Sequence, residues 1–124
     1  MIDSIETKSN GIITSKKTSN TRELYEHQKK AMANLDIINR NSSYNTLVVL
    51  PTGGGKTYTA AVWLLRNAID RKKKTLWIAH RQTLLDQAAK TFQNYAFSEI
   101  IPSISSFRYR IISGAPEHDR TIDI

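Results

Sequence analysis

The chain has 124 residues, a formal net charge of +7 and no cysteine. Its length allows one domain at most, and the lack of cysteine excludes disulfides and cysteine-ligated metal sites. No stretch reaches the ~20 apolar residues of a membrane-spanning helix, and the N-terminus lacks the apolar core of a signal peptide. We therefore expect a soluble, cytoplasmic protein with no membrane partner.

Residues 1–20 are rich in Ser, Thr, Asn and Lys, so we expect a polar, poorly ordered lead-in. Ile12 and Ile13 allow a short edge strand as the alternative. Residues 21–124 then form the domain. Its first part, residues 21–39, has apolar residues at three- and four-residue steps, which predicts an amphipathic helix with Thr21 as its N-cap.

Residues 46–57 contain the most informative pattern of the chain. An apolar, β-branched run from Thr46 to Leu50 predicts a buried strand, and Pro-Thr-Gly-Gly-Gly-Lys-Thr follows it. A helical pattern over residues 56–70 comes next. Strand, glycine loop, Lys-Thr and helix are the context of a phosphate-binding loop, although Leu50 replaces the first glycine of the generic motif.

The chemistry of this loop follows from its residue types. Gly53, Gly54 and Gly55 lack Cβ atoms, so their amide N–H groups can curl around an anion. The start of the following helix adds unpaired N–H groups and a partial positive charge. Lys56 would reach the β- and γ-phosphates of a nucleotide, and the Thr57 hydroxyl would ligate Mg²⁺.

Positive charge is concentrated in residues 71–110, where eight residues are basic and two are acidic. This suggests affinity for polyanions such as nucleic acid, and an ordinary solvated surface is the alternative that charge alone leaves open. The run from Arg71 to Lys74 ends a helix, where cations meet the negative end of the dipole. We therefore expect this run to be solvated, at the sheet edge opposite the phosphate loop.

A second buried strand is predicted at residues 75–79, followed by a helix at 82–95. Because such junctions face the ligand side of a parallel sheet, residues 80–83 are candidates for ligand contacts. Residues 107–112 predict a third, partly exposed strand. The later triplet Glu117-His118-Asp119 has no second ligand cluster, so we interpret it as structural rather than as a metal site.

The order of these patterns resembles superfamily 2 helicases of the DEAD/DEAH type, in particular the ATPase subunits of type III restriction enzymes. Residues 51–57 resemble motif I, and Leu-Tyr-Glu-His-Gln-Lys-Lys-Ala at residues 24–31 resembles the Q motif. Residues 76–88 resemble motif Ia. The three motifs cover about residues 22–92, most of the chain.

The resemblance implies an α/β fold of the P-loop NTPase class, with a partial RecA-like parallel sheet flanked by helices. ATP and Mg²⁺ are the implied cofactors. Nucleic acid is the implied partner, with DNA favoured over RNA, together with the remainder of the helicase core. Lys56 and Thr57 are the implied catalytic residues, and Gln28 would read the adenine base. The implied nucleotide contacts are Gln28, Thr52, Gly53, Gly54, Gly55, Lys56 and Thr57. The implied nucleic-acid contacts are His80, Arg81, Gln82 and Thr83.

The sequence lacks the Asp-Glu pair of motif II and the motifs that follow it in these helicases. We therefore expect the first part of a longer ATPase, and the activity of these 124 residues alone stays open. Two functions remain. One is the ATP-binding part of a helicase or translocase that couples hydrolysis to movement on nucleic acid. The other is a nucleotide-binding remnant or regulatory module without catalysis.

Overall fold

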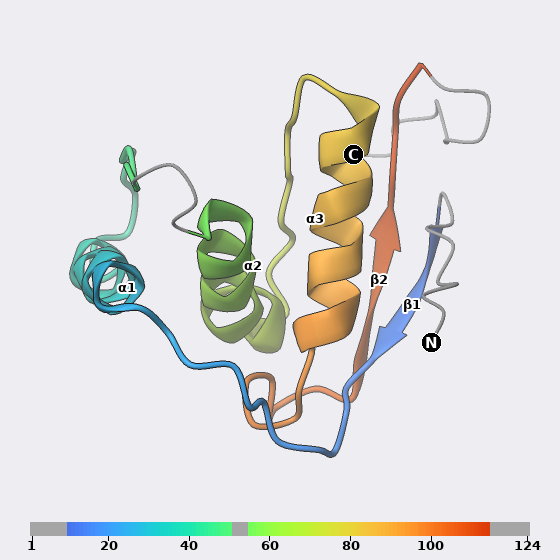
Figure 1. The fold of residues 1–124 in the computed structure, drawn as a ribbon, viewed down its shortest axis with the longest axis horizontal. Coiled ribbons are helices and arrows are strands. Elements are labelled where there is room, and N and C mark those ends of the chain that lie inside the picture. Colours follow the sequence, from blue (N-terminus) through green and yellow to red (C-terminus); the bar gives the residue numbers. More distant parts are fainter. Residues whose placement is uncertain (1–9, 51–54, 115–124) are drawn as a thin grey trace.

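A computed structural model of the chain describes residues 10–50 and 55–114 (Figure 1). Its elements follow the order β1 (Asn10–Thr14), α1 (Glu26–Ile38), α2 (Lys56–Asn67), the 3-10 helix η1 (Ile69–Arg71), α3 (Gln82–Tyr95) and β2 (Ser106–Arg110). The described residues thus mix helix and strand.

The three predicted helices are present. α3 has the predicted bounds, and α2 begins at the predicted residue but ends at Asn67, where η1 continues the chain. α1 begins later than predicted, because its N-cap is Tyr25 and not Thr21. The Oδ1 atom of Asn20 accepts the backbone N–H of Arg22 at 3.1 Å, a local turn that keeps this stretch outside the helix.

The sheet differs from the prediction. β1 and β2 pair antiparallel, with Ile12 opposite Arg108, and no parallel ladder links the three predicted strands within residues 10–50 and 55–114. Residues 10–14, expected to be poorly ordered, therefore form the strand that was the alternative for this stretch. β2 lies at the third predicted strand, and its residues alternate between exposed and half-buried.

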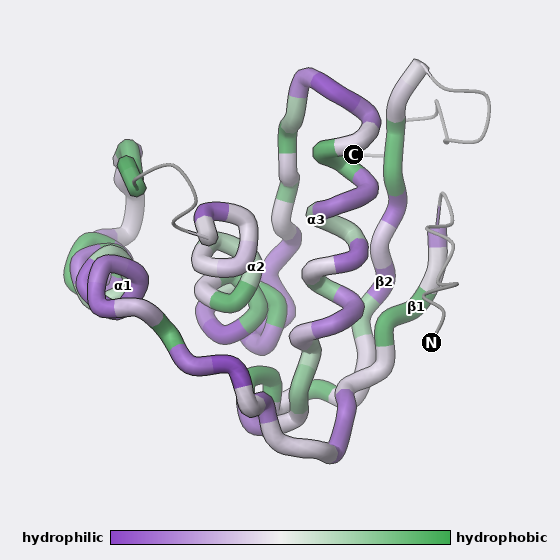
Figure 2. Tube along the Cα trace, in the orientation of Figure 1, coloured by the Kyte–Doolittle hydropathy of each residue, from purple (hydrophilic) through white to green (hydrophobic). Residues whose placement is uncertain are grey.

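The other two predicted strands, residues 46–50 and 75–79, have no regular secondary structure. Their apolar residues appear as green stretches in Figure 2. A strand is maintained by hydrogen bonds to a neighbouring strand, and the described residues supply no neighbour to either run. As a result, four side chains are between 78% and 85% exposed, namely Leu47, Val49, Leu76 and Ile78.

The core joins α2 to the C-terminal end of α3 and the turn that follows it. The apolar residues of α2 are buried, with Leu65 fully so, and Ile100 and Ile101 of the turn belong to the same cluster. α1 is attached to α2 through a hydrogen bond of 2.9 Å, donated by Trp63 Nε1 to Asp36 Oδ1. Among the described helices, none combines the length and the hydropathy needed to cross a bilayer.

Candidate functional site

The start of α2 is determined by Gly55. This N-cap residue has φ 72° and ψ 44°, in the left-handed region that glycine adopts at little cost. The carbonyl oxygen of Gly55 accepts the backbone N–H of Thr59 at 2.9 Å and its hydroxyl at 2.8 Å. The glycine therefore turns the chain sharply into the first turn of the helix.

Among the described residues no side chain caps the N-terminus of α2, and no acidic residue lies in its first turn. The first N–H groups of a helix have no intrahelical partner and carry a partial positive charge. Together these features leave the start of α2 able to accept an anion such as phosphate.

Lys56 and Thr57 add two functional groups at the same end. Lys56 is exposed and Thr57 is half-buried. Within the described part of the chain, neither side chain makes a hydrogen bond or an ion pair. With no partner among the described residues, this ammonium and this hydroxyl lie beside the first N–H groups of the helix, and together they fit a nucleotide phosphate with Mg²⁺. The remaining loop contacts, Thr52, Gly53 and Gly54, lie outside the described residues and stay predictions.

Gln28 lies against the glycine, as its place in the predicted site requires. Its side chain is fully buried, and its Oε1 atom accepts the backbone N–H of Tyr25 at 2.9 Å. Its Nε2 atom donates to the carbonyl of Gly55 at 3.4 Å. The structure thus gives Gln28 a role in joining α1 to Gly55 at the start of α2, and its contact with adenine stays a prediction.

Residues 80–83 precede and begin α3. His80, Arg81, Gln82 and Thr83 are all exposed, and Arg81 is the N-cap in an extended conformation. No side chain caps this helix either. Exposed donors at an uncapped helix start suit contacts to a sugar-phosphate backbone.

The structure does not bring these residues to the start of α2. Tyr58, in the first turn of α2, packs edge-on against Tyr95 with ring centroids 4.6 Å apart. Tyr95 ends α3, whose 14 residues span about 21 Å, so Arg81 lies at the far end of that helix. The expectation of a shared edge depended on the parallel sheet, which the described residues lack.

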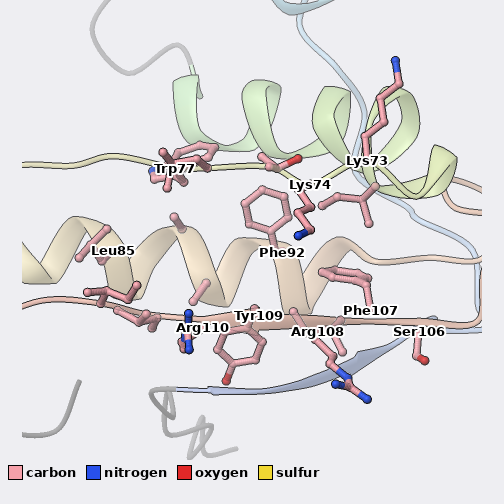
Figure 3. Close-up of a pocket in the computed structure, with 18 of the residues that line it drawn as sticks. Lys73, Lys74, Trp77, Leu85, Phe92, Ser106, Phe107, Arg108, Tyr109 and Arg110 are labelled. Atoms are coloured by element: carbon pink, nitrogen blue, oxygen red, sulfur yellow. The ribbon is translucent and has the colours of Figure 1, made fainter. Parts of the chain in front are cut away.

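The basic run from Arg71 to Lys74 is exposed, as predicted. It borders a groove of about 700 Å³ between residues 72–77, α3 and β2 (Figure 3). Apolar side chains of α3, including Phe92, line the groove, and Arg108 of β2 borders it. This groove is separate from the start of α2.

One residue near α2 was missed by the sequence analysis. The guanidinium carbon of Arg22 lies 3.8 Å from the centroid of the Tyr58 ring. Nothing in the local sequence indicates this contact, because Arg22 precedes a helix by several residues and Tyr58 fits a core stripe.

The described residues contain no group of three His, Cys, Asp or Glu side chains that could hold a metal ion. The triplet Glu117-His118-Asp119, interpreted as structural, lies outside the described residues.

A comparison with family models identifies the chain. The model described as "Type III restriction enzyme, res subunit" matches residues 21–118, most of the sequence. The chain belongs to this family. It is a family of helicase-like ATPases, so the res subunit resemblance predicted from the motifs is confirmed. Comparisons with curated proteins and with solved structures gave no match.

Proposed function

We propose that this chain binds ATP with Mg²⁺ at the start of α2 and is the ATP-binding part of a nucleic-acid-dependent ATPase. The observation that carries the proposal is the start of α2, where Lys56 and Thr57 follow a left-handed glycine and have no partner among the described residues. Membership of a helicase-like ATPase family supports the nucleotide and the metal.

In this proposal the residues of the chain bind and orient the triphosphate. The N–H groups at the start of α2 donate to phosphate oxygens, and the ammonium of Lys56 neutralises charge on the terminal phosphates. The hydroxyl of Thr57 holds Mg²⁺, which offsets the charge that develops on the phosphate oxygens during transfer. Gln28 discriminates adenine in this proposal by exchanging its hydrogen bonds to Tyr25 and Gly55 for the edge of the base.

The nucleic-acid partner is assigned to residues 80–83, with DNA favoured over RNA. Support comes from their exposure at an uncapped helix start and from the family. In this proposal, ATP binding at the start of α2 has to influence DNA binding at Arg81, which lies at the other end of α3.

A second function is a nucleotide-binding module without turnover. The same groups at the start of α2 would bind the phosphates in such a module. Phosphoryl transfer needs a residue that positions the attacking water.

One experiment separates the two functions. Phosphate release from ATP and Mg²⁺ is measured with and without single-stranded DNA, beside calorimetric binding of ATP. Binding with DNA-stimulated release supports the ATPase. Binding without release at any DNA concentration supports the module, and absence of binding rejects both.

A further inference from the structure

Residues 75–79 have the form of a strand without a partner strand. Thr75, Trp77 and Ala79 are half-buried, and the side chains between them are exposed, which is the alternation of an extended chain. Over these residues, the part of the chain that the structure describes contains no backbone–backbone hydrogen bond. The backbone of this segment is therefore available to another strand.

β2 has an open edge as well. Among the described residues it pairs only with β1, which lies on the side of β2 away from residues 75–79 (Figure 1, Figure 3). Residues 106–109 make no further backbone–backbone hydrogen bond to the described part of the chain. The second edge of β2 therefore faces residues 75–79 across the groove that both segments line.

α3 covers the gap between these two segments. Trp77 packs edge-on against Phe92 of α3, with ring centroids 5.6 Å apart. The hydroxyl of Tyr109 in β2 accepts a hydrogen bond of 3.2 Å from Gln93 Nε2 of the same helix. Both segments present alternate side chains to α3, as strands of one sheet do. The groove between them therefore has the walls of a sheet that lacks one strand.

The groove favours a segment that is apolar on one face and acidic on the other. Ala88 and Ala89 line it from α3, and their short side chains leave room for larger apolar ones. Five of its described lining residues are basic and none is acidic. Arg108 is exposed, on the face of β2 away from Tyr109, and has no ion pair within the described residues.

Residues 121–124, Thr-Ile-Asp-Ile, have this pattern. They lie outside the described residues and follow Gly114 after a connection of six residues. Six residues can span ~20 Å, enough to return from Gly114 to the end of the groove that Ile112 lines. Residues 115–124 contain three acidic residues and one arginine, so their charge complements that of the groove.

We propose that residues 121–124 add as a strand between residues 75–79 and β2. Backbone hydrogen bonds to the two open edges and burial of the two isoleucines against α3 stabilise this strand. Asp123 lies on the opposite face with Arg108, where opposite charges on neighbouring strands attract each other.

Disulfide trapping in the full chain tests the proposal, because the chain has no cysteine of its own. Ala89→Cys is combined in turn with Ile122→Cys, Ile124→Cys and Asp123→Cys, and each pair is oxidised at low protein concentration. Asp123→Cys is the matched control, because alternation turns this position away from α3. A second control combines Ile122→Cys with Lys90→Cys, which is at an exposed position of the same helix.

At least one isoleucine pair should form an intramolecular disulfide about tenfold faster than either control, since two cysteines are bridged only at Cα separations of roughly 4.4–6.8 Å. Equal rates in all pairs, or no disulfide in any, would overturn the proposal. Disulfides formed only between two chains would also overturn it and would indicate that a second copy occupies the groove.

Amide hydrogen exchange tests the same strand without cysteine substitutions. In the wild-type chain residues 75–79 should exchange slowly, although the described residues supply no hydrogen-bond partner for them. Ile122→Pro removes a backbone donor and should raise these exchange rates about tenfold. Fast exchange in the wild type, or rates that the proline leaves unchanged, would refute the added strand.

Discussion

Gly55 is a position where both the backbone conformation and the neighbouring Gln28 disfavour a side chain. A side chain at φ 72° costs about 1–2 kcal/mol, and a Cβ atom there would collide with the amide of Gln28. Gly55→Ala should therefore lower the free energy of unfolding by at least about 1 kcal/mol in urea titrations. Gly114→Ala is the control, because a Cβ at Gly114 meets nothing within 4 Å. Equal effects of the two substitutions would contradict this account of Gly55.

Gln28 has two expected contributions that can be measured separately. Its removal leaves the N–H of Tyr25 without its acceptor, so Gln28→Ala should cost about 1–3 kcal/mol of stability. It should also reduce the preference for ATP over GTP more than it reduces affinity for tripolyphosphate. Competition binding measures the preference, with Gln87→Ala on the exposed face of α3 as the control. Unchanged discrimination would confine Gln28 to its structural role.

At the scale of elements, we expect a substitution at the start of α3 to weaken DNA binding and a substitution in the loop before residue 75 to have little effect. Arg81→Ala should weaken binding of single-stranded DNA and reduce the slope of log affinity against log salt by about 0.7, the value for one phosphate contact. Lys73→Ala removes the same charge and should have a much smaller effect. Fluorescence anisotropy at several salt concentrations measures both. A larger effect at Lys73 would indicate that DNA binds at the groove beside Lys72 to Lys74 and not at the start of α3.

The helices could be predicted from the sequence because their signal is local. In α2, the apolar residues repeat at helical spacing, and the same residues form the core. The strand predictions for residues 46–50 and 75–79 were wrong, because a strand needs a neighbouring strand that is often far away in the sequence. For the same reason, β1 was given only as the alternative to a poorly ordered lead-in. Ile12 and Ile13 alone do not show that β2 pairs with this stretch.

The pattern around Lys56 predicted the helix start, which the structure has at that residue. Gln28 was expected near it from the resemblance of residues 24–31 to the Q motif, and it lies against Gly55. The nucleotide and nucleic-acid contacts stay predictions. The sequence could not show that Tyr58 packs against Tyr95 at the C-terminal end of α3, nor that Arg22 lies over the ring of Tyr58. Both contacts depend on packing between distant segments, which local patterns do not encode.

At the scale of the whole molecule, the exposed apolar runs should govern association. Leu76 and Ile78 are 84% and 83% exposed, and exposed apolar segments without ladder partners promote self-association. The double variant Leu76→Lys and Ile78→Lys should sediment as a smaller species than wild type. Ser42→Lys and Ser43→Lys add the same charge at exposed polar positions and serve as the control. Equal sedimentation of both double variants would show that charge, and not loss of the apolar run, is responsible.

The central claim is that the start of α2 binds the phosphates of ATP. Calorimetric titration of ATP with Mg²⁺ into wild type and Lys56→Ala tests it most directly, since the substitution removes charge-assisted hydrogen bonds to the terminal phosphates. Circular dichroism checks that the exposed Lys56 is replaced without loss of helix. We predict measurable binding by wild type and none by the variant at the same concentrations. Equal ATP affinity in the two proteins would contradict the account.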